Sequence, residues 1–152
     1  MGLFSPGVGK TARKTVTFTG GAGLGLAASN VTIFTVTGRI LVHAITAFCT
    51  TSLEESGATA TMTLGTTTNT SRFLATPTGG AVALDANEWW VTGAAPVAGS
   101  IDLTTASAGA TDQAAVVVSE NVILLPAVTN ITAGVLEIYM VWEPLSASAT
   151  VV

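Results

Sequence analysis

Short stretches of alternating apolar and polar residues run along the whole chain, a pattern typical of strands with one buried face. Residues 15–19 alternate threonine with an apolar residue, so Val16 and Phe18 fall on one face. Residues 59–64 repeat the pattern and predict a core face made of Ala60, Met62 and Leu64. The longest alternation covers residues 135–142. Its expected core face holds Leu136, Ile138, Met140 and Trp142.

Glycine, proline and polar turns separate further apolar segments, and no segment has the length and period of an amphipathic helix. Additional strands are expected at 31–37, 39–49, 72–75, 88–92, 101–103, 114–118 and 122–125. The last two flank Ser119-Glu120-Asn121, which is typical of a hairpin with a three-residue turn. The chain is therefore predicted to be all-β, a single antiparallel β-sandwich or jelly-roll-like domain.

The first fourteen residues look different from the rest. Glycines and Pro6 oppose regular structure there, and Lys10, Arg13 and Lys14 are three of the five basic residues in the chain. We expect an extended N-terminal arm over 1–14 and the sandwich domain over 15–152. Three charges give little affinity for nucleic acid. Because the rest of the chain is acidic, the arm is expected to dock on an acidic neighbouring subunit; the alternative is a solvated terminus.

The chain has unusually few charged residues. Charged residues make up only 9% of the chain, against about 25% in an ordinary soluble domain. Hydrophobic residues make up 49%, and the mean hydropathy is +0.63. Either a membrane protein or a subunit that buries its surface against neighbours would fit. A spanning helix needs about 20 apolar residues in a row, and no segment reaches that length. No signal peptide is visible, so synthesis in a cytoplasm is expected.

Candidate chemistry is sparse. His43 is the only histidine and Cys49 the only cysteine, so no metal cluster is predicted. In the strand expected at 39–49, alternation places both on the same face as Ile45, so His43 is expected in the core or in an interface and Cys49 in the core.

The segment Gly7–Thr11 resembles the end of a phosphate-binding loop, but Phe4 stands where that loop needs a glycine. Asp85 and Glu88 could form a glycosidase-like acid pair, but beyond Trp89 and Trp90 nothing supplies an aromatic-lined sugar cleft. We therefore expect no cofactor and no enzymatic activity.

The adjacent Trp89 and Trp90 point to opposite faces if they lie in one strand. One is then part of the core, and the other is exposed or covered by a neighbour, as interface tryptophans often are. Burial of both within the domain and binding of a sugar are the alternatives. Together with the basic residues, the pair completes the candidate interface: Lys10, Arg13, Lys14, Trp89 and Trp90.

Three segments carry a resemblance to a group of small structural proteins of tailed bacteriophages. They are Lys14–Gly25 (KTVTFTGGAGLG), Phe34–Gly38 (FTVTG) and Val141–Ser146 (VWEPLS). The resemblance covers most of the chain and implies a virion protein made in the host cytoplasm. Chaperone-assembled pilins share the threonine-rich composition, but they are exported and usually carry paired cysteines, which this chain lacks.

Among positions in a virion, capsid decoration is expected. A decoration, or cement, protein would bind the major capsid protein on the outer head shell as a homotrimer and stabilise the shell, with no direct contact to nucleic acid or membrane. The alternative is a head-fibre, tail or baseplate component with a receptor- or glycan-binding role.

Overall fold

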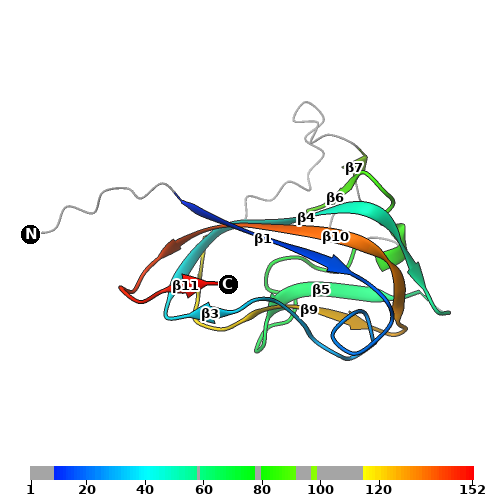
Figure 1. The fold of residues 1–152 in the computed structure, drawn as a ribbon, viewed down its shortest axis with the longest axis horizontal. Coiled ribbons are helices and arrows are strands. Elements are labelled where there is room, and N and C mark those ends of the chain that lie inside the picture. Colours follow the sequence, from blue (N-terminus) through cyan, green and yellow to red (C-terminus); the bar gives the residue numbers. More distant parts are fainter. Residues whose placement is uncertain (1–8, 58, 78–79, 92–96, 99–114) are drawn as a thin grey trace, which may run out of the picture.

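A computed structural model describes residues 9–57, 59–77, 80–91, 97–98 and 115–152. Apart from one short 3-10 helix at Ala81–Ala83, the regular structure in these residues consists of strands (Figure 1). The strands are β1 (Lys10–Thr17), β2 (Val31–Phe34), β3 (Val36–Thr37), β4 (Ile40–Glu55), β5 (Thr61–Thr66), β6 (Glu88–Trp90), β7 (Val97–Ala98), β8 (Val116–Val118), β9 (Val122–Ala127), β10 (Ile131–Pro144) and β11 (Thr150–Val151).

The larger layer is a six-stranded sheet in the order β1-β10-β4-β6-β7, with β8 also paired to β4. Every pairing in it is antiparallel. The two longest strands, β4 and β10, lie side by side at its centre (Figure 1). One edge of β4 carries β10, and the other carries β8 near the start of the strand and β6 further along. β1 is therefore an edge strand of this sheet.

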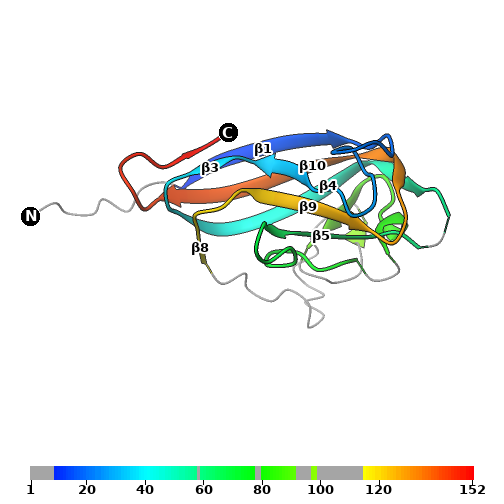
Figure 2. The same ribbon diagram turned by 90° about the horizontal axis from the view of Figure 1, so that it is seen from below.

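The smaller layer is a three-stranded antiparallel sheet, β2-β9-β5, and β3 pairs separately with β11. Figure 2 shows β9 and β5 lying against one side of the large sheet. The core fills the space between the layers. Its fully buried side chains include Ile45, Trp90 and Ile138 from the large sheet and Met62 and Leu124 from the small one. The prediction of an all-β, antiparallel, sandwich-like domain is confirmed.

The longest alternating segments fold as predicted. Ala60, Met62 and Leu64 are each 0% exposed, and so are Leu136 and Ile138. Glycine allows the loop between β1 and β2 to approach β10, where Gly25 has φ +112° and an added Cβ would lie 2.2 Å from the carbonyl oxygen of Ile131. Only a residue without a side chain fits there.

The start of the domain differs from the expectation. Residues 10–14, which we assigned to the arm, form the first part of β1 and pair with residues 138–142 of β10. The paired backbone of the long β10 stabilises this extended segment, and an edge strand tolerates exposed lysines. Residues 1–8 of the expected arm lie outside the described residues.

The predicted hairpin over 114–125 is wrong. β8 pairs with β4 in the large sheet, whereas β9 is the middle strand of the small sheet. The segment between them crosses from one layer to the other and is held by its polar side chains. Asn121 Oδ1 accepts a hydrogen bond from the Val36 amide at 3.1 Å, and Glu120 accepts bonds from Thr67 and Thr68. These bonds lower the pKa of Glu120.

Two other expected strands also change, and a third is not tested. The segment 31–37 is divided at Thr35 into β2 and β3, which belong to different sheets. Residues 72–75 form no strand and contribute only the isolated bridge between Leu64 and Leu74. The expected strand at 101–103 lies outside the described residues.

The alternation in β10 predicts that substitutions on its two faces change the free energy of unfolding by different amounts. Ile138→Ala removes a fully buried side chain and should lower the free energy of unfolding by about 2–5 kcal/mol. Val141→Ala, on the opposite face and 37% exposed, should change it by no more than about 0.5 kcal/mol. Urea denaturation of both variants measures the difference. Equal losses would contradict the assignment of the two faces.

Candidate interaction surface

The large sheet has a second face, turned away from the core, which we call the outer sheet face. Because side chains alternate along a strand, residues next to buried ones point to this face. Ile138 and Met140 are buried on one side of β10, and Glu137, Tyr139 and Val141 project on the other. The outer sheet face comprises Arg13, Leu41, Phe48, Val117, Trp89, Glu137, Tyr139 and Val141.

Three aromatic side chains form a row across β4, β6 and β10. Phe48 and Trp89 are register partners, with ring centroids 4.8 Å apart and planes inclined by 44°. Tyr139, on β10, also contacts Trp89, with ring centroids 6.0 Å apart and an inclination of 41°. Both pairs have tilted geometries that aromatic rings favour. All three side chains are half-buried, so each ring fixes its neighbour while part of it stays accessible.

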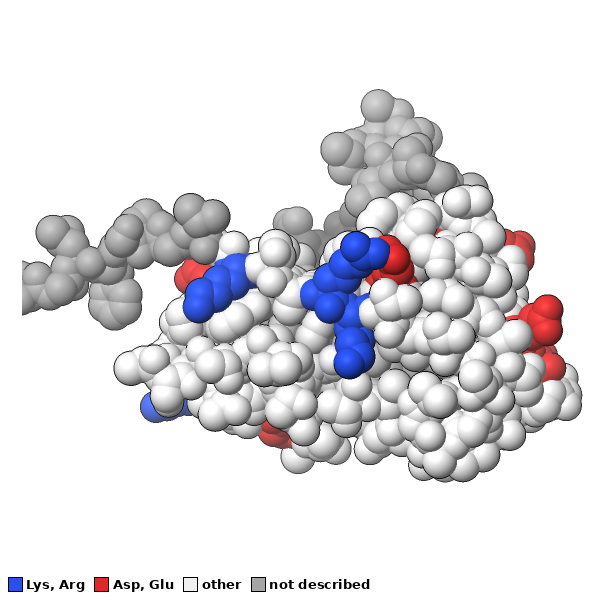
Figure 3. Space-filling view, viewed as in Figure 1, with Lys and Arg blue, Asp and Glu red and all other residues white. Residues whose placement is uncertain are grey.

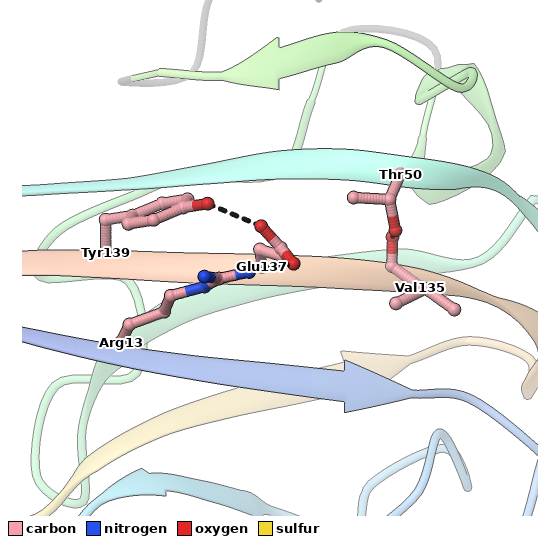
Figure 4. A network of polar contacts seen from close by, with 5 residues as sticks. All are labelled: Arg13, Thr50, Val135, Glu137 and Tyr139. Carbon is pink, nitrogen blue, oxygen red and sulfur yellow. Dashed lines mark hydrogen bonds and ion pairs between the residues drawn. The ribbon is translucent and has the colours of Figure 1, made fainter.

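A polar network lies beside the aromatic row (Figure 4). The Glu137 carboxylate accepts hydrogen bonds from the Tyr139 hydroxyl and from the Arg13 guanidinium. Both bonds lower the pKa of Glu137, and the same contacts raise the pKa values of Tyr139 and Arg13. The Arg13 guanidinium also lies 5.5 Å from the Tyr139 ring centroid. The side chain of Arg13 is 57% exposed and that of Glu137 only 18%. The network therefore exposes mainly the Arg13 guanidinium, which the Glu137 carboxylate holds in place.

A β-bulge interrupts β4 at His43. Val42 pairs with Trp142 and Ala44 with Val141, which leaves His43 as the extra residue. The expectation that His43 shares a face with Ile45 and Cys49 is therefore wrong: both of those are buried, whereas His43 is on the outer sheet face. Its Nε2 lies 3.1 Å from Oε1 of Glu143, without hydrogen-bond geometry.

Burial raises the pKa of the Cys49 thiol to about 11, so the side chain stays protonated at neutral pH. A buried thiol in this state is a core residue and a poor nucleophile. No group of three or more potential metal ligands occurs among the residues that the structure describes. Within the same residues, no helix is long and apolar enough to cross a membrane.

The structure divides the basic residues expected to act together. Arg13 belongs to the outer sheet face. Lys10 and Lys14 lie an even number of residues from the buried Val16, so they project from the same side of β1 as Val16, at the rim of the core. Lys10 Nζ is 5.1 Å from the centroid of the Trp142 ring. Figure 3 shows basic groups over β1, with acidic atoms beside the left and the central ones.

The two adjacent tryptophans also separate. Trp90 is 0% exposed, and its indole Nε1 donates a hydrogen bond to the carbonyl oxygen of Ala75 at 2.9 Å. It therefore fixes the core and cannot touch a partner in this conformation. Trp89 is on the outer sheet face. Sequence reasoning missed Phe48, Glu137 and Tyr139, although alternation in 135–142 already placed the last two on the non-core face.

Comparison with known proteins gives one result. No protein-family model matches the chain, and no curated protein matches it. A solved chain from the cyanophage Pam1 capsid asymmetric unit is similar to it, with a TM-score of 0.55 and 17% sequence identity. The similarity covers 95% of this chain and 94% of that chain. The two chains therefore share a fold over nearly their whole lengths.

The Glu137 network predicts a pH-dependent contribution to stability. Because the folded pKa of Glu137 lies below its ordinary value of 4.5, the stabilisation is present above that value and is lost as the pH falls through the folded pKa. Glu137→Gln should therefore lower the urea midpoint at neutral pH, and the difference from wild type should shrink on acidification. Tyr139→Phe should act in the same direction. A difference that is constant with pH would refute this assignment.

Proposed function

We propose that this protein is a non-enzymatic virion structural protein of a tailed phage, specifically a decoration protein. In this proposal it binds the major capsid protein on the outer head shell as a homotrimer and stabilises the shell. The observation that carries the proposal is the fold shared, over 95% of this chain, with a chain of a phage capsid. The sequence resemblance to small phage virion proteins supports the same class independently.

The outer sheet face is the surface we assign to the shell. A solvated face of an antiparallel sheet is ordinarily polar. Here the central β4 carries Leu41 and Phe48 on that face, and the neighbouring strands add Val117 and Val141, which are 55% and 37% exposed. Burial of these apolar side chains by a partner would be favourable. A surface of this kind also fits a chain with only 9% charged residues.

The centre of the outer sheet face has the composition of a binding hot spot. Tryptophan, tyrosine and arginine dominate the binding energy of protein interfaces, and Trp89, Tyr139 and Arg13 meet here on three different strands. Their mutual contacts hold the side chains in place before binding. Less conformational entropy is then lost when a partner docks.

The proposed mechanism is clamping by several modest contacts. On the order of 300 Å² of apolar surface buried per subunit would contribute about 7.5 kcal/mol at about 25 cal/mol per Å², before the costs of association. A trimer makes three such contacts, and once the first forms the others become intramolecular. Capsid subunits bridged in this way would resist the outward pressure of packaged DNA.

A head-fibre, tail or baseplate role with glycan binding is the alternative. The row formed by Phe48, Trp89 and Tyr139 favours it, because the partly accessible ring of Trp89 could stack on a sugar. Binding of oligosaccharides by the purified protein, lost in Trp89→Ala, together with no binding to head shells, would support this role over decoration.

The docking assignment predicts that Trp89→Ala weakens binding to undecorated head shells by about 30-fold, the effect of losing a hot-spot contact worth about 2 kcal/mol. Co-sedimentation of the purified variant with shells measures the affinity. Leu24→Ala is the control, because Leu24 is 44% exposed but lies in the loop after β1. Equal binding by wild type and Trp89→Ala would contradict the docking surface.

Stabilisation of the shell is a separate expectation. Undecorated shells should rupture at a lower temperature than shells to which the protein has been added back, because the added contacts must break first. Release of packaged DNA on heating measures this. Shells that retain DNA equally well with and without the protein would refute the cementing role.

A further inference from the structure

The large sheet ends in an open edge. β1 pairs with β10 along all eight of its residues, and no other strand in the described part of the chain pairs with it. The unpaired backbone groups of such an edge can bind another chain, and proteins control this by placing charged side chains there. The side chains along β1 therefore decide which partner the edge accepts.

This edge is basic. Lys10 and Lys14 are exposed, and no carboxylate among the described residues forms an ion pair with either of them. Arg13, between them, is committed to Glu137 on the outer sheet face. Pairing between two β1 strands from different copies would bring like charges together. Charge repulsion thus disfavours pairing of two β1 edges, and an acidic partner is favoured.

The chain carries an acidic surface of its own at the other end of the molecule. Asp85 follows the short helix and lies near the end of β4, where the Ala86 amide donates to Ser52 Oγ and the Leu53 amide to the Leu84 carbonyl. Glu54 is the next residue of β4. Figure 3 shows several acidic groups and no basic group at the right-hand end of the molecule; further acidic groups lie elsewhere, some of them beside the basic ones.

Two of the four carboxylates at this end are available to a partner. Glu55 accepts a hydrogen bond from the Ala60 amide, and Glu88 accepts one from the Asp85 amide at 2.8 Å. Glu54 and Asp85 are exposed and form no ion pair within the described residues. They therefore present two carboxylates that match the two lysines of the β1 edge in number.

The basic edge and the acidic end are too far apart to meet within one molecule. Across β10, Lys10 aligns with Val42 of β4 and Lys14 with Ala47, and Glu54 lies twelve and seven positions further along β4. At ~3.3 Å per residue the separations are about 40 Å for Lys10 and about 23 Å for Lys14. A contact between these surfaces must therefore join different copies.

We propose that the β1 edge of one copy, through Lys10 and Lys14, docks on the acidic end of the next, through Glu54 and Asp85. The contact joins two different surfaces, so it is head-to-tail and produces a ring when the rotation closes. If the proposed function is correct, this contact is the subunit interface of its trimer. It leaves the outer sheet face free for the shell.

The test uses purified full-length protein without capsids. Sedimentation velocity measures the mass of wild type, Lys10→Glu/Lys14→Glu, Glu54→Lys/Asp85→Lys and the variant carrying all four reversals. Each double variant should be monomeric, because its two contact surfaces then have the same sign. The fourfold variant should regain the wild-type mass, and an equimolar mixture of the two double variants should form alternating complexes of even number.

Arg39→Glu/Arg72→Glu is the matched control, since it makes the same change in net charge at two exposed positions away from β1. It should keep the wild-type mass. Loss of the oligomer in this control, or failure of the fourfold variant to reassociate, would overturn the proposal. Circular dichroism checks that each variant is folded.

The wild-type protein supplies a test that needs no variant. Its dissociation constant should rise at least about tenfold between about 0.05 M and about 1 M salt, because screening weakens exposed ion pairs. A wild type that is monomeric throughout, or an oligomer insensitive to salt, would overturn the proposal. Rings that do not bind shells would refute only the decoration role. Monomers that bind shells would refute only the ring contact.

Discussion

The pairing of β4 with β10 is the constraint on which the rest of the structure depends. The two strands match at twelve register positions, and β1, β6 and β8 each pair with one of them, while β7 pairs with β6. Their common alternation sends Ile45 and Ile138 into the core and Phe48 and Tyr139 to the outer sheet face. A slip of one residue would exchange the faces, so burial of the core fixes the composition of the interaction surface as well.

Local pattern predicted the strands better than their partners. The core face of 135–142 follows from alternation alone, and so do the opposite directions of Trp89 and Trp90. The failed hairpin at 114–125 looks local in sequence, but its two strands find better partners in separate layers. Arg13 and Glu137 are 124 positions apart, and nothing near either residue indicates that they meet. The bulge at His43 was likewise invisible, because it arises only from the register with β10.

The few charged residues of the chain are concentrated in particular parts of the fold. The few charges are not spread evenly: one network holds Arg13 on the outer sheet face, two lysines lie on the open edge of β1, and carboxylates gather at the far end of β4. The neutral surface between them suits burial against other proteins. We interpret the molecule as having one surface for the shell and two complementary surfaces for its own copies.

A cryo-electron microscopy map of the particle that carries this protein would distinguish a decoration protein from a tail component. We expect density for the sandwich on the outside of the head shell, with Trp89 and Tyr139 against capsid subunits. Density in the tail, or on the head with the outer sheet face turned to solvent, would contradict it.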